Sequence, residues 1–165
     1  MKILTLLRHA KSSWDDAGLA DHDRSLAKRG YHDAPRMGRR LAELGLEPDL
    51  LLTSSALRAR QTAELVEPKL RNDRLTVAVD PNLYLASPGE LLHVLQQTAA
   101  SIDCLVMVGH NPGLTQLANM LLPTLNLDNL PTAGAVAIEC DVENWAQLDA
   151  AARKLLFYEY PKKLS

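Results

Sequence analysis

Short runs of apolar residues alternate along this chain with longer segments in which apolar residues recur every three or four positions. The short runs predict buried strands, at residues 3–7, 50–53, 75–79, 104–109, 135–140 and 154–160. The periodic segments predict helices, at residues 26–44, 56–70, 88–95 and 114–122. This alternation is typical of a three-layer α/β/α sandwich with a mostly parallel central sheet. Because no long helix separates the last two runs, we expect one of them to join as an antiparallel edge strand.

Local signals mark the ends of two predicted helices. We expect Ser25 to cap the first helix and Gly45 to end it. Pro35 falls inside this segment and predicts a break, a kink or two helical pieces. The third helix begins with a capping pattern, in which Ser87 is the cap and Glu90 stands three residues later.

Composition narrows the class of protein. The chain has 165 residues, of which 47% are hydrophobic, and this predicts one domain over residues 1–165. A net charge of −2 argues against nucleic acid as a partner. Cys104 and Cys140 lie in apolar runs and are expected to be small core residues in a reducing compartment. No run approaches the ~18 apolar residues of a membrane span, and the apolar stretch at the amino terminus is too short for a secretory signal. We expect a soluble, cytoplasmic protein.

A cluster of polar residues follows the first strand. Arg8 and His9 come directly after the apolar run, and Lys11, Ser12 and Ser13 follow at once. Ligands of open α/β sheets bind outside the carboxyl ends of the strands. Arginine offers a planar fork of donors and neutral histidine a nucleophilic nitrogen, so this cluster suits a phosphoryl group. The alternative is that these residues only cap the strand in solvent.

Two further strand-to-helix junctions carry similar residues. Arg58 follows the second strand, and His110 follows the fourth. The fold can bring them to Arg8 and His9 at one edge of the sheet, where two arginines and two histidines would repel one another unless an anion bound. Taken singly, His110 could be a structural histidine and Arg58 part of a solvated helix face. Their shared position after strands favours a phosphoryl site.

A series of motifs resembles a known family. LRHAKS, DRSLAKRG, TSSALRARQTAE, VGHNPG and LPTAGA follow in this order, at residues 7–12, 23–30, 53–64, 108–113 and 130–135. Together they resemble the histidine phosphatase superfamily and, within it, the small SixA-type phosphohistidine phosphatases. The resemblance implies a phosphoglycerate mutase-like fold, a single histidine phosphatase domain over residues 1–165, and His9 as the nucleophile. It implies that Arg8, Arg58 and His110 bind the transferring phosphoryl group, with Lys11, Ser12 and Asp15 as further candidates for phosphate binding.

The chain departs from the wider family at two places. Ala10 replaces the usual glycine after the nucleophile, and Asp15 stands where many members have an asparagine. The segment after the third strand, where sugar-phosphate members supply a general acid, has no carboxylate before Glu90. We expect Glu90 to serve the helix start instead. A missing acid fits an N-phosphorylated substrate, because a phosphoramidate needs less help to expel its leaving group than an alkoxide does.

The resulting prediction is a phosphohistidine phosphatase. Neutral His9 attacks phosphorus, water hydrolyses the phosphohistidine intermediate, and protonated His110 helps the two arginines to surround the charge. No cofactor or metal is expected, since His22, His32 and His93 lack ligand spacing. The expected partner is a phosphohistidine-bearing protein, a phosphotransfer domain or a phosphocarrier, with no nucleic acid and no membrane, and the protein is expected to be a monomer. Two alternatives stay open: a phosphatase of small phosphate esters that uses Glu90 or Asp15 as its acid, and a non-catalytic module that binds phosphate or a phosphoprotein.

Overall fold

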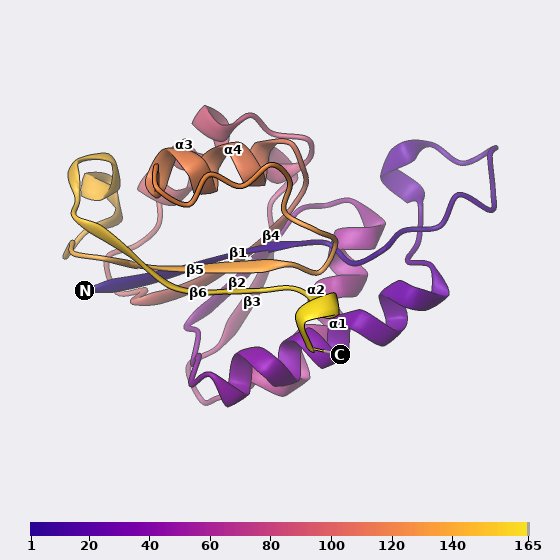
Figure 1. The fold of residues 1–165 in the computed structure, drawn as a ribbon, viewed down its shortest axis with the longest axis horizontal. Helices are drawn as coiled ribbons and strands as arrows, with labels where there is room; N and C mark the ends of the chain where they lie inside the picture. Colours follow the sequence, from indigo (N-terminus) through magenta and orange to yellow (C-terminus); the bar gives the residue numbers. More distant parts are fainter. Residues whose placement is uncertain (165) are drawn as a thin grey trace.

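The computed structural model describes residues 1–164 and, within them, a six-stranded sheet between two layers of helices (Figure 1). The strands are β1 (Lys2–Arg8), β2 (Leu50–Thr53), β3 (Thr76–Val79), β4 (Cys104–Gly109), β5 (Ala135–Cys140) and β6 (Arg153–Glu159). The α-helices are α1 (Lys28–Glu43), α2 (Leu57–Leu70), α3 (Pro88–Gln96) and α4 (Gly113–Leu121). In Figure 1, α3 and α4 lie above the sheet and α1 and α2 below it. The predicted α/β/α sandwich is confirmed. Ser165, the last residue of the predicted domain, lies outside the described residues.

The order of strands across the sheet is β3-β2-β4-β1-β5-β6. The first four strands of the chain run parallel, whereas β5 is antiparallel to β1 and the edge strand β6 is antiparallel to β5. The predicted antiparallel pairing at the edge is therefore present. In the parallel register, Arg8 lies opposite Gly109, and Thr53 lies opposite Val108. The chain thus leaves β1, β2 and β4 at the same edge of the sheet.

Burial on both faces explains the apolar runs that predicted the strands. In β1, Leu4 and Leu6 belong to the core cluster that includes residues of α3 and α4. Leu7 belongs to a second cluster, which includes residues of α1 and α2. Every residue of β4 is buried. A strand covered by helices on both sides has no solvent face, so its sequence does not alternate between apolar and polar residues.

The start of α1 differs from the prediction. Ser25 does not cap this helix, which begins at Lys28 after Ala27. The preceding segment stays extended because Ser12 forms a β-bridge with Leu26, and the Ala27 N–H donates to the Lys11 carbonyl at 2.8 Å. Pairing with the segment after β1 therefore delays the helix by two residues.

Three further local signals concern the interior and the ends of the helices. The prediction of a break or of two helical pieces at Pro35 is wrong, since α1 continues through it as one helix. The kink offered as the third possibility stays a prediction. The buried face of α1 packs against α2, and this tertiary packing outweighs the local penalty of a proline. Gly45 ends the helix as predicted, with a φ of 86°. The capping box is also present: the Glu90 N–H donates to the Ser87 hydroxyl at 3.1 Å, and the Ser87 N–H donates to the Glu90 carboxylate at 3.1 Å.

The remaining predictions about elements hold to within one or two residues. Cys104 and Cys140 are buried and free, as expected of small core residues. Burial raises the pKa of the Cys104 thiol to about 12 and that of Cys140 to about 11. None of the helices within residues 1–164 has the length and apolar character that crossing a membrane requires.

Candidate active site

The structure brings together the four residues that the sequence singles out. Arg8 is the last residue of β1, and His9 follows it. Arg58 lies in the first turn of α2, and His110 directly follows β4. Arg8 is half-buried, whereas His9, Arg58 and His110 expose only 6%, 3% and 4% of their surface. The shared edge of β1, β2 and β4 accounts for this convergence.

His9 is held as a neutral imidazole with one defined tautomer. Its Nδ1 lies 2.7 Å from the Ala10 carbonyl oxygen, which can only accept, so Nδ1 carries the hydrogen and Nε2 the lone pair. The Ala10 N–H donates to the Thr62 hydroxyl at 2.9 Å, which ties this segment to α2. Burial lowers the pKa of His9 to about 3, and the charges of His110, Arg58 and Arg8 act in the same direction. At neutral pH, His9 therefore has a nucleophilic nitrogen.

His110 lies beside His9, with 5.2 Å between the ring centroids. Its Nε2 lies 2.8 Å from the Ser54 hydroxyl, and its Nδ1 lies 3.4 Å from Nη2 of Arg58, which can only donate. Burial and then the charge of Arg58 lower the pKa of His110 to about 4. His110 is thus neutral at neutral pH when no anion is bound. The predicted protonated His110 belongs to the complex with the phosphoryl group and stays a prediction. A dianion bound next to it would raise this pKa.

The two arginines carry donors without partners. Arg8 donates from Nη1 to the Leu130 carbonyl at 3.0 Å. The Nε atoms of Arg8 and Arg58 are buried, and within residues 1–164 neither has a hydrogen-bond partner. Burial lowers the pKa of Arg8, and the nearby charge of Arg58 adds to this effect. Buried donors are nearly always paired in proteins, so two unpaired guanidinium donors near His9 indicate a site for an anion.

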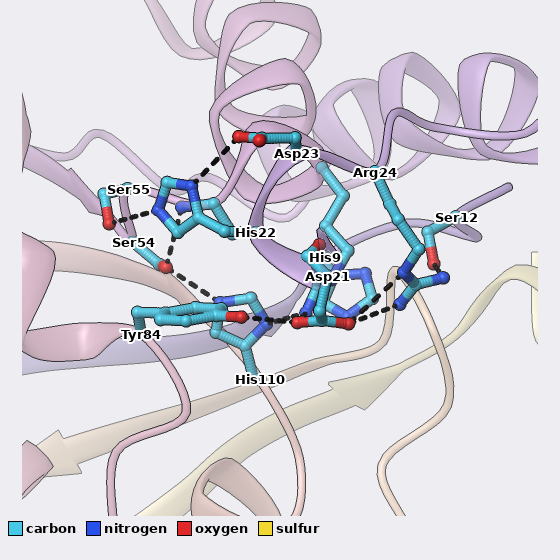
Figure 2. A network of polar contacts seen from close by, with 12 residues as sticks. His9, Ser12, Asp21, His22, Asp23, Arg24, Ser54, Ser55, Tyr84 and His110 are labelled. Carbon is cyan, nitrogen blue, oxygen red and sulfur yellow. Dashed lines mark hydrogen bonds and ion pairs between the residues drawn. The ribbon is translucent and has the colours of Figure 1, made fainter. Parts of the chain in front are cut away.

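Asp21 is the main residue of this region that sequence reasoning missed. It begins the short 3-10 helix η1 (Asp21–Asp23), in the loop after β1. Its carbonyl oxygen accepts from Nη1 of Arg58 at 2.7 Å, and its carboxylate accepts from Nη2 at 3.0 Å. Figure 2 shows this carboxylate between the Tyr84 hydroxyl, which donates to it at 2.5 Å, and Arg24, whose Nε donates at 3.2 Å. The motif DRSLAKRG begins at Asp23, so the resemblance to the family does not point to Asp21.

The contacts of the Asp21 carboxylate keep it ionised. The hydrogen bond from Tyr84 is the largest cause that lowers the pKa of Asp21, and the bond and charge of Arg58 add to it, giving a value of about 2. Burial, together with the neighbouring Asp21, raises the pKa of Tyr84. At neutral pH, the carboxylate is charged and the phenol is protonated.

Tyr84 comes from the segment after β3, where the resemblance led us to look for an acid. Its ring meets His110 edge-on, with the centroids 5.5 Å apart. It meets His22 in the same manner at 4.8 Å, and Nε2 of His22 lies 2.9 Å from the Ser55 hydroxyl. In this chain, the side chain that the segment after β3 directs toward His110 is therefore a phenol and not a carboxylate.

The three additional candidates for phosphate binding are Lys11, Ser12 and Asp15, and they lie farther from the centre of the site than the four residues above. Ser12 is buried, and its hydroxyl accepts from Arg24 at 3.0 Å, at the outer end of the network in Figure 2. Lys11 is half-buried and Asp15 is exposed. Within residues 1–164, neither of these two side chains makes a hydrogen bond or ion pair. Their roles in phosphate binding stay predictions.

Glu90, one of the two candidate acids of the small-ester alternative, lies at the start of a helix. Glu90 is exposed at the start of α3, and its hydrogen bonds with Ser87 lower its pKa. Among residues 1–164, no three side chains of His, Cys, Asp or Glu are grouped so that they could hold a metal ion. The groups gathered at the sheet edge are two neutral imidazoles, the guanidinium donors of Arg8 and Arg58, and the ionised carboxylate of Asp21.

Known proteins share this architecture. A protein histidine phosphatase SixA, solved in complex with tungstate, is similar in fold with a TM-score of 0.82 at 22% identity, and the match covers 99% of both chains. This likeness agrees with the phosphoglycerate mutase-like fold that the motifs imply.

Sequence comparison gives the family. An uncharacterized protein of Mycobacterium tuberculosis is 31% identical over 168 residues, which is 94% of this chain and 100% of that protein. An uncharacterized chloroplastic protein of Arabidopsis thaliana is 37% identical over 126 residues, and the match covers 72% of this chain but only 58% of the plant protein. The family model of the histidine phosphatase superfamily (branch 1) matches residues 4–102. The chain belongs to branch 1 of the histidine phosphatase superfamily.

Proposed function

We propose that this protein is a metal-independent phosphatase that removes the phosphoryl group from a phosphohistidine on a partner protein, a phosphotransfer domain or a phosphocarrier. The observation that carries the proposal is the pair of buried Nε–H groups of Arg8 and Arg58 beside neutral His9, which have no hydrogen-bond partner within residues 1–164. Fixed cationic donors favour a phosphoryl dianion, and a neutral imidazole is a competent nucleophile.

The proposed reaction has two steps. The Nε2 lone pair of His9 attacks phosphorus, while the bond from phosphorus to the substrate imidazole breaks. That imidazole leaves as a neutral base when its distal nitrogen already carries a proton. His9 then carries the phosphoryl group on Nε2, while its Nδ1–H donates to the Ala10 carbonyl. Water attacks phosphorus in the second step, which restores neutral His9 and releases dihydrogen phosphate.

Electrostatic stabilisation is the main work of the other residues. The negative charge of a phosphoryl transition state spreads over three equatorial oxygens, and Arg8 and Arg58 supply the opposing charge. We expect His110 to take up a proton as the dianion binds, because an adjacent negative charge raises its pKa from about 4. It then becomes a third donor to the phosphoryl oxygens.

The choice of an N-linked substrate rests on the carboxylates. The pKa values of both Glu90 and Asp21 are lowered, so neither carboxyl holds a proton to give at neutral pH. A phosphate ester needs a proton donor for its alkoxide, whereas a protonated phosphoimidazole does not. The similarity in fold to a protein histidine phosphatase supports the same substrate class.

A substrate panel tests this function. The protein is assayed in EDTA with a ³²P-labelled phosphohistidine protein, prepared with phosphoramidate, and with sugar phosphates at equal concentration. We expect turnover of the phosphohistidine protein and an acid-labile label on the enzyme that His9→Ala abolishes. Faster turnover of sugar phosphates would favour the small-ester alternative. Phosphate binding with neither turnover nor label would favour the non-catalytic module.

A further inference from the structure

We infer that Asp21 is a positioning residue for phosphoryl transfer, which holds Arg58 so that its Nε–H stays free for the phosphoryl group. The inference rests on the proposed function, since it assigns Arg58 to the phosphoryl site. It concerns a residue of the loop after β1 that the motifs do not single out.

The first argument is the division of the Arg58 donors. Both terminal nitrogens are bound by one residue, since Nη1 donates to the Asp21 carbonyl at 2.7 Å and Nη2 donates to its carboxylate at 3.0 Å. Nε is buried and has no partner within residues 1–164. A guanidinium whose two terminal nitrogens are both bound to one residue presents its Nε–H in a fixed direction. Arg58 is therefore oriented before substrate binds.

The second argument is that Asp21 is itself held in place. Tyr84 donates to its carboxylate at 2.5 Å, and Arg24 donates at 3.2 Å. Arg24 is buried and also donates to the Ser12 hydroxyl at 3.0 Å, close to the end of β1. Figure 2 shows this chain of contacts running from Tyr84 to Ser12. The loop is thus fastened to both sides of the site.

The two effects of the Asp21 charge have opposite signs. Its negative charge weakens the attraction between Arg58 and a phosphoryl dianion. Its hydrogen bonds orient Arg58, which favours the transition state because the donors need no reorganisation during the reaction. Removing the Asp21 carboxylate leaves the bond from Arg58 Nη1 to the Asp21 carbonyl in place but frees Nη2. This change should therefore slow turnover without weakening the binding of an oxyanion. A residue that only maintained the loop would not separate these two quantities.

The test compares Asp21 with a neighbour in the same turn. Asp21→Ala, Asp21→Asn, Asp23→Ala and Asp23→Asn are assayed with phosphoramidate as the substrate and with inorganic phosphate as a competitive inhibitor. Asp23 is a matched control because its carboxylate contacts only His22, at 3.5 Å, among the described residues. We expect Asp21→Ala to lower kcat by about 10- to 100-fold. This is less than the roughly 10²- to 10³-fold loss when a direct oxyanion donor is removed, because Asp21 acts through Arg58. Its inhibition constant for phosphate should stay equal or fall.

The conservative variant and the control complete the test. Asp21→Asn keeps an oxygen acceptor for Arg58 and should recover part of kcat, while both Asp23 variants should match the wild type. Equal kcat in the Asp21 and Asp23 variants would overturn the inference, and so would a higher kcat in Asp21→Ala, which would make Asp21 a competitor of substrate. Parallel loss of kcat, phosphate affinity and melting temperature would show a structural role instead. Failure of the wild type to turn over phosphoramidate would count against the proposed function rather than against Asp21.

Discussion

Both ends of the central sheet carry charged groups, but these charges are compensated by opposite charges at one end and much less at the other. At the amino end of β1, Lys2 is 2% exposed and donates to the Ala100 carbonyl and to the Asp103 carboxylate. Near the amino end of β2, Asp49 accepts from the Asp103 and Cys104 N–H groups and from Arg74 at 2.9 Å. Each of these charges has an opposite charge beside it.

At the carboxyl end of the same strands, positive groups gather with little compensation. Arg8 and Arg58 lie near two buried imidazoles. In the described part of the chain, Arg58 has a carboxylate partner, Asp21, and Arg8 has none. Both imidazoles are driven to the neutral form, and two arginine donors lack partners within residues 1–164. A charge with an opposite charge beside it is compensated within the fold, whereas an uncompensated cluster of like charges with shifted pKa values indicates a ligand. The contrast supports the proposal that the carboxyl end carries the functional site.

The largest expected effect at the carboxyl end comes from His9→Ala. This change removes the nucleophile but keeps Arg8, Arg58 and His110, so turnover should be abolished while inorganic phosphate still binds. Steady-state assays and isothermal titration calorimetry measure these two quantities. Turnover near the wild-type rate would contradict the assignment of His9.

The next largest effect is expected at Arg58, and Lys2, at the opposite end of the sheet, serves as the comparison. Arg58→Ala should lower kcat/KM by about 10³-fold or more, as for arginines at other phosphoryl-transfer sites, and should weaken phosphate inhibition. Lys2→Met should instead lower the free energy of unfolding by about 1–3 kcal/mol, because the buried hydrogen bonds are lost. Its kcat/KM should stay close to wild type. Equal effects of the two variants on kcat/KM would remove the distinction between the ends.

A smaller effect is a loss of stability in mild acid. The folded pKa values of His9 and His110 are about 3 and about 4, below the value of 6.5 for an exposed histidine. Between these values the unfolded chain binds more protons, so stability is retained above pH ~6.5 and falls as the pH decreases. From these shifts we expect each histidine to cost about 2 kcal/mol at pH 5 relative to pH 7.

Urea titrations at the two pH values measure this loss. His110→Gln removes one of the two buried titrating groups, so the difference between pH 7 and pH 5 should shrink by about half. An unchanged difference in the variant would mean that His110 does not carry its share of the acid sensitivity.

The smallest expected effect belongs to Glu90, which lies outside the cluster of cations. Glu90→Gln keeps a capping-box side chain, so α3 should remain intact and most activity on a phosphohistidine protein should be retained. A general acid contributes about 10²- to 10⁴-fold, so a loss of ~100-fold in a folded variant would make Glu90 the proton donor. The small-ester alternative would then be favoured.

Much of this architecture follows from local patterns. Apolar runs locate the central strands because a sheet covered on both faces buries most of their side chains, as in β4, where every residue is buried. The positions of Arg8, His9, Arg58 and His110 after these strands predict their convergence, since parallel strands end at one edge. The capping box at Ser87 and the helix end at Gly45 are also local, because they depend on residues within one turn.

Other features depend on contacts between distant segments, which no local pattern encodes. Ser25 fails to cap α1 because Ser12 pairs with Leu26, and α1 continues through Pro35 because α2 packs against it. Asp21 reaches Arg58, 37 positions away, and Tyr84, 63 positions away. The sequence by itself therefore determined which residues stand at the ends of the strands. Only the tertiary structure decided which of their donors are paired. The pairing of Arg58 depends on where the loop that contains Asp21 packs, and the sequence of this loop has no periodic pattern that predicts its position.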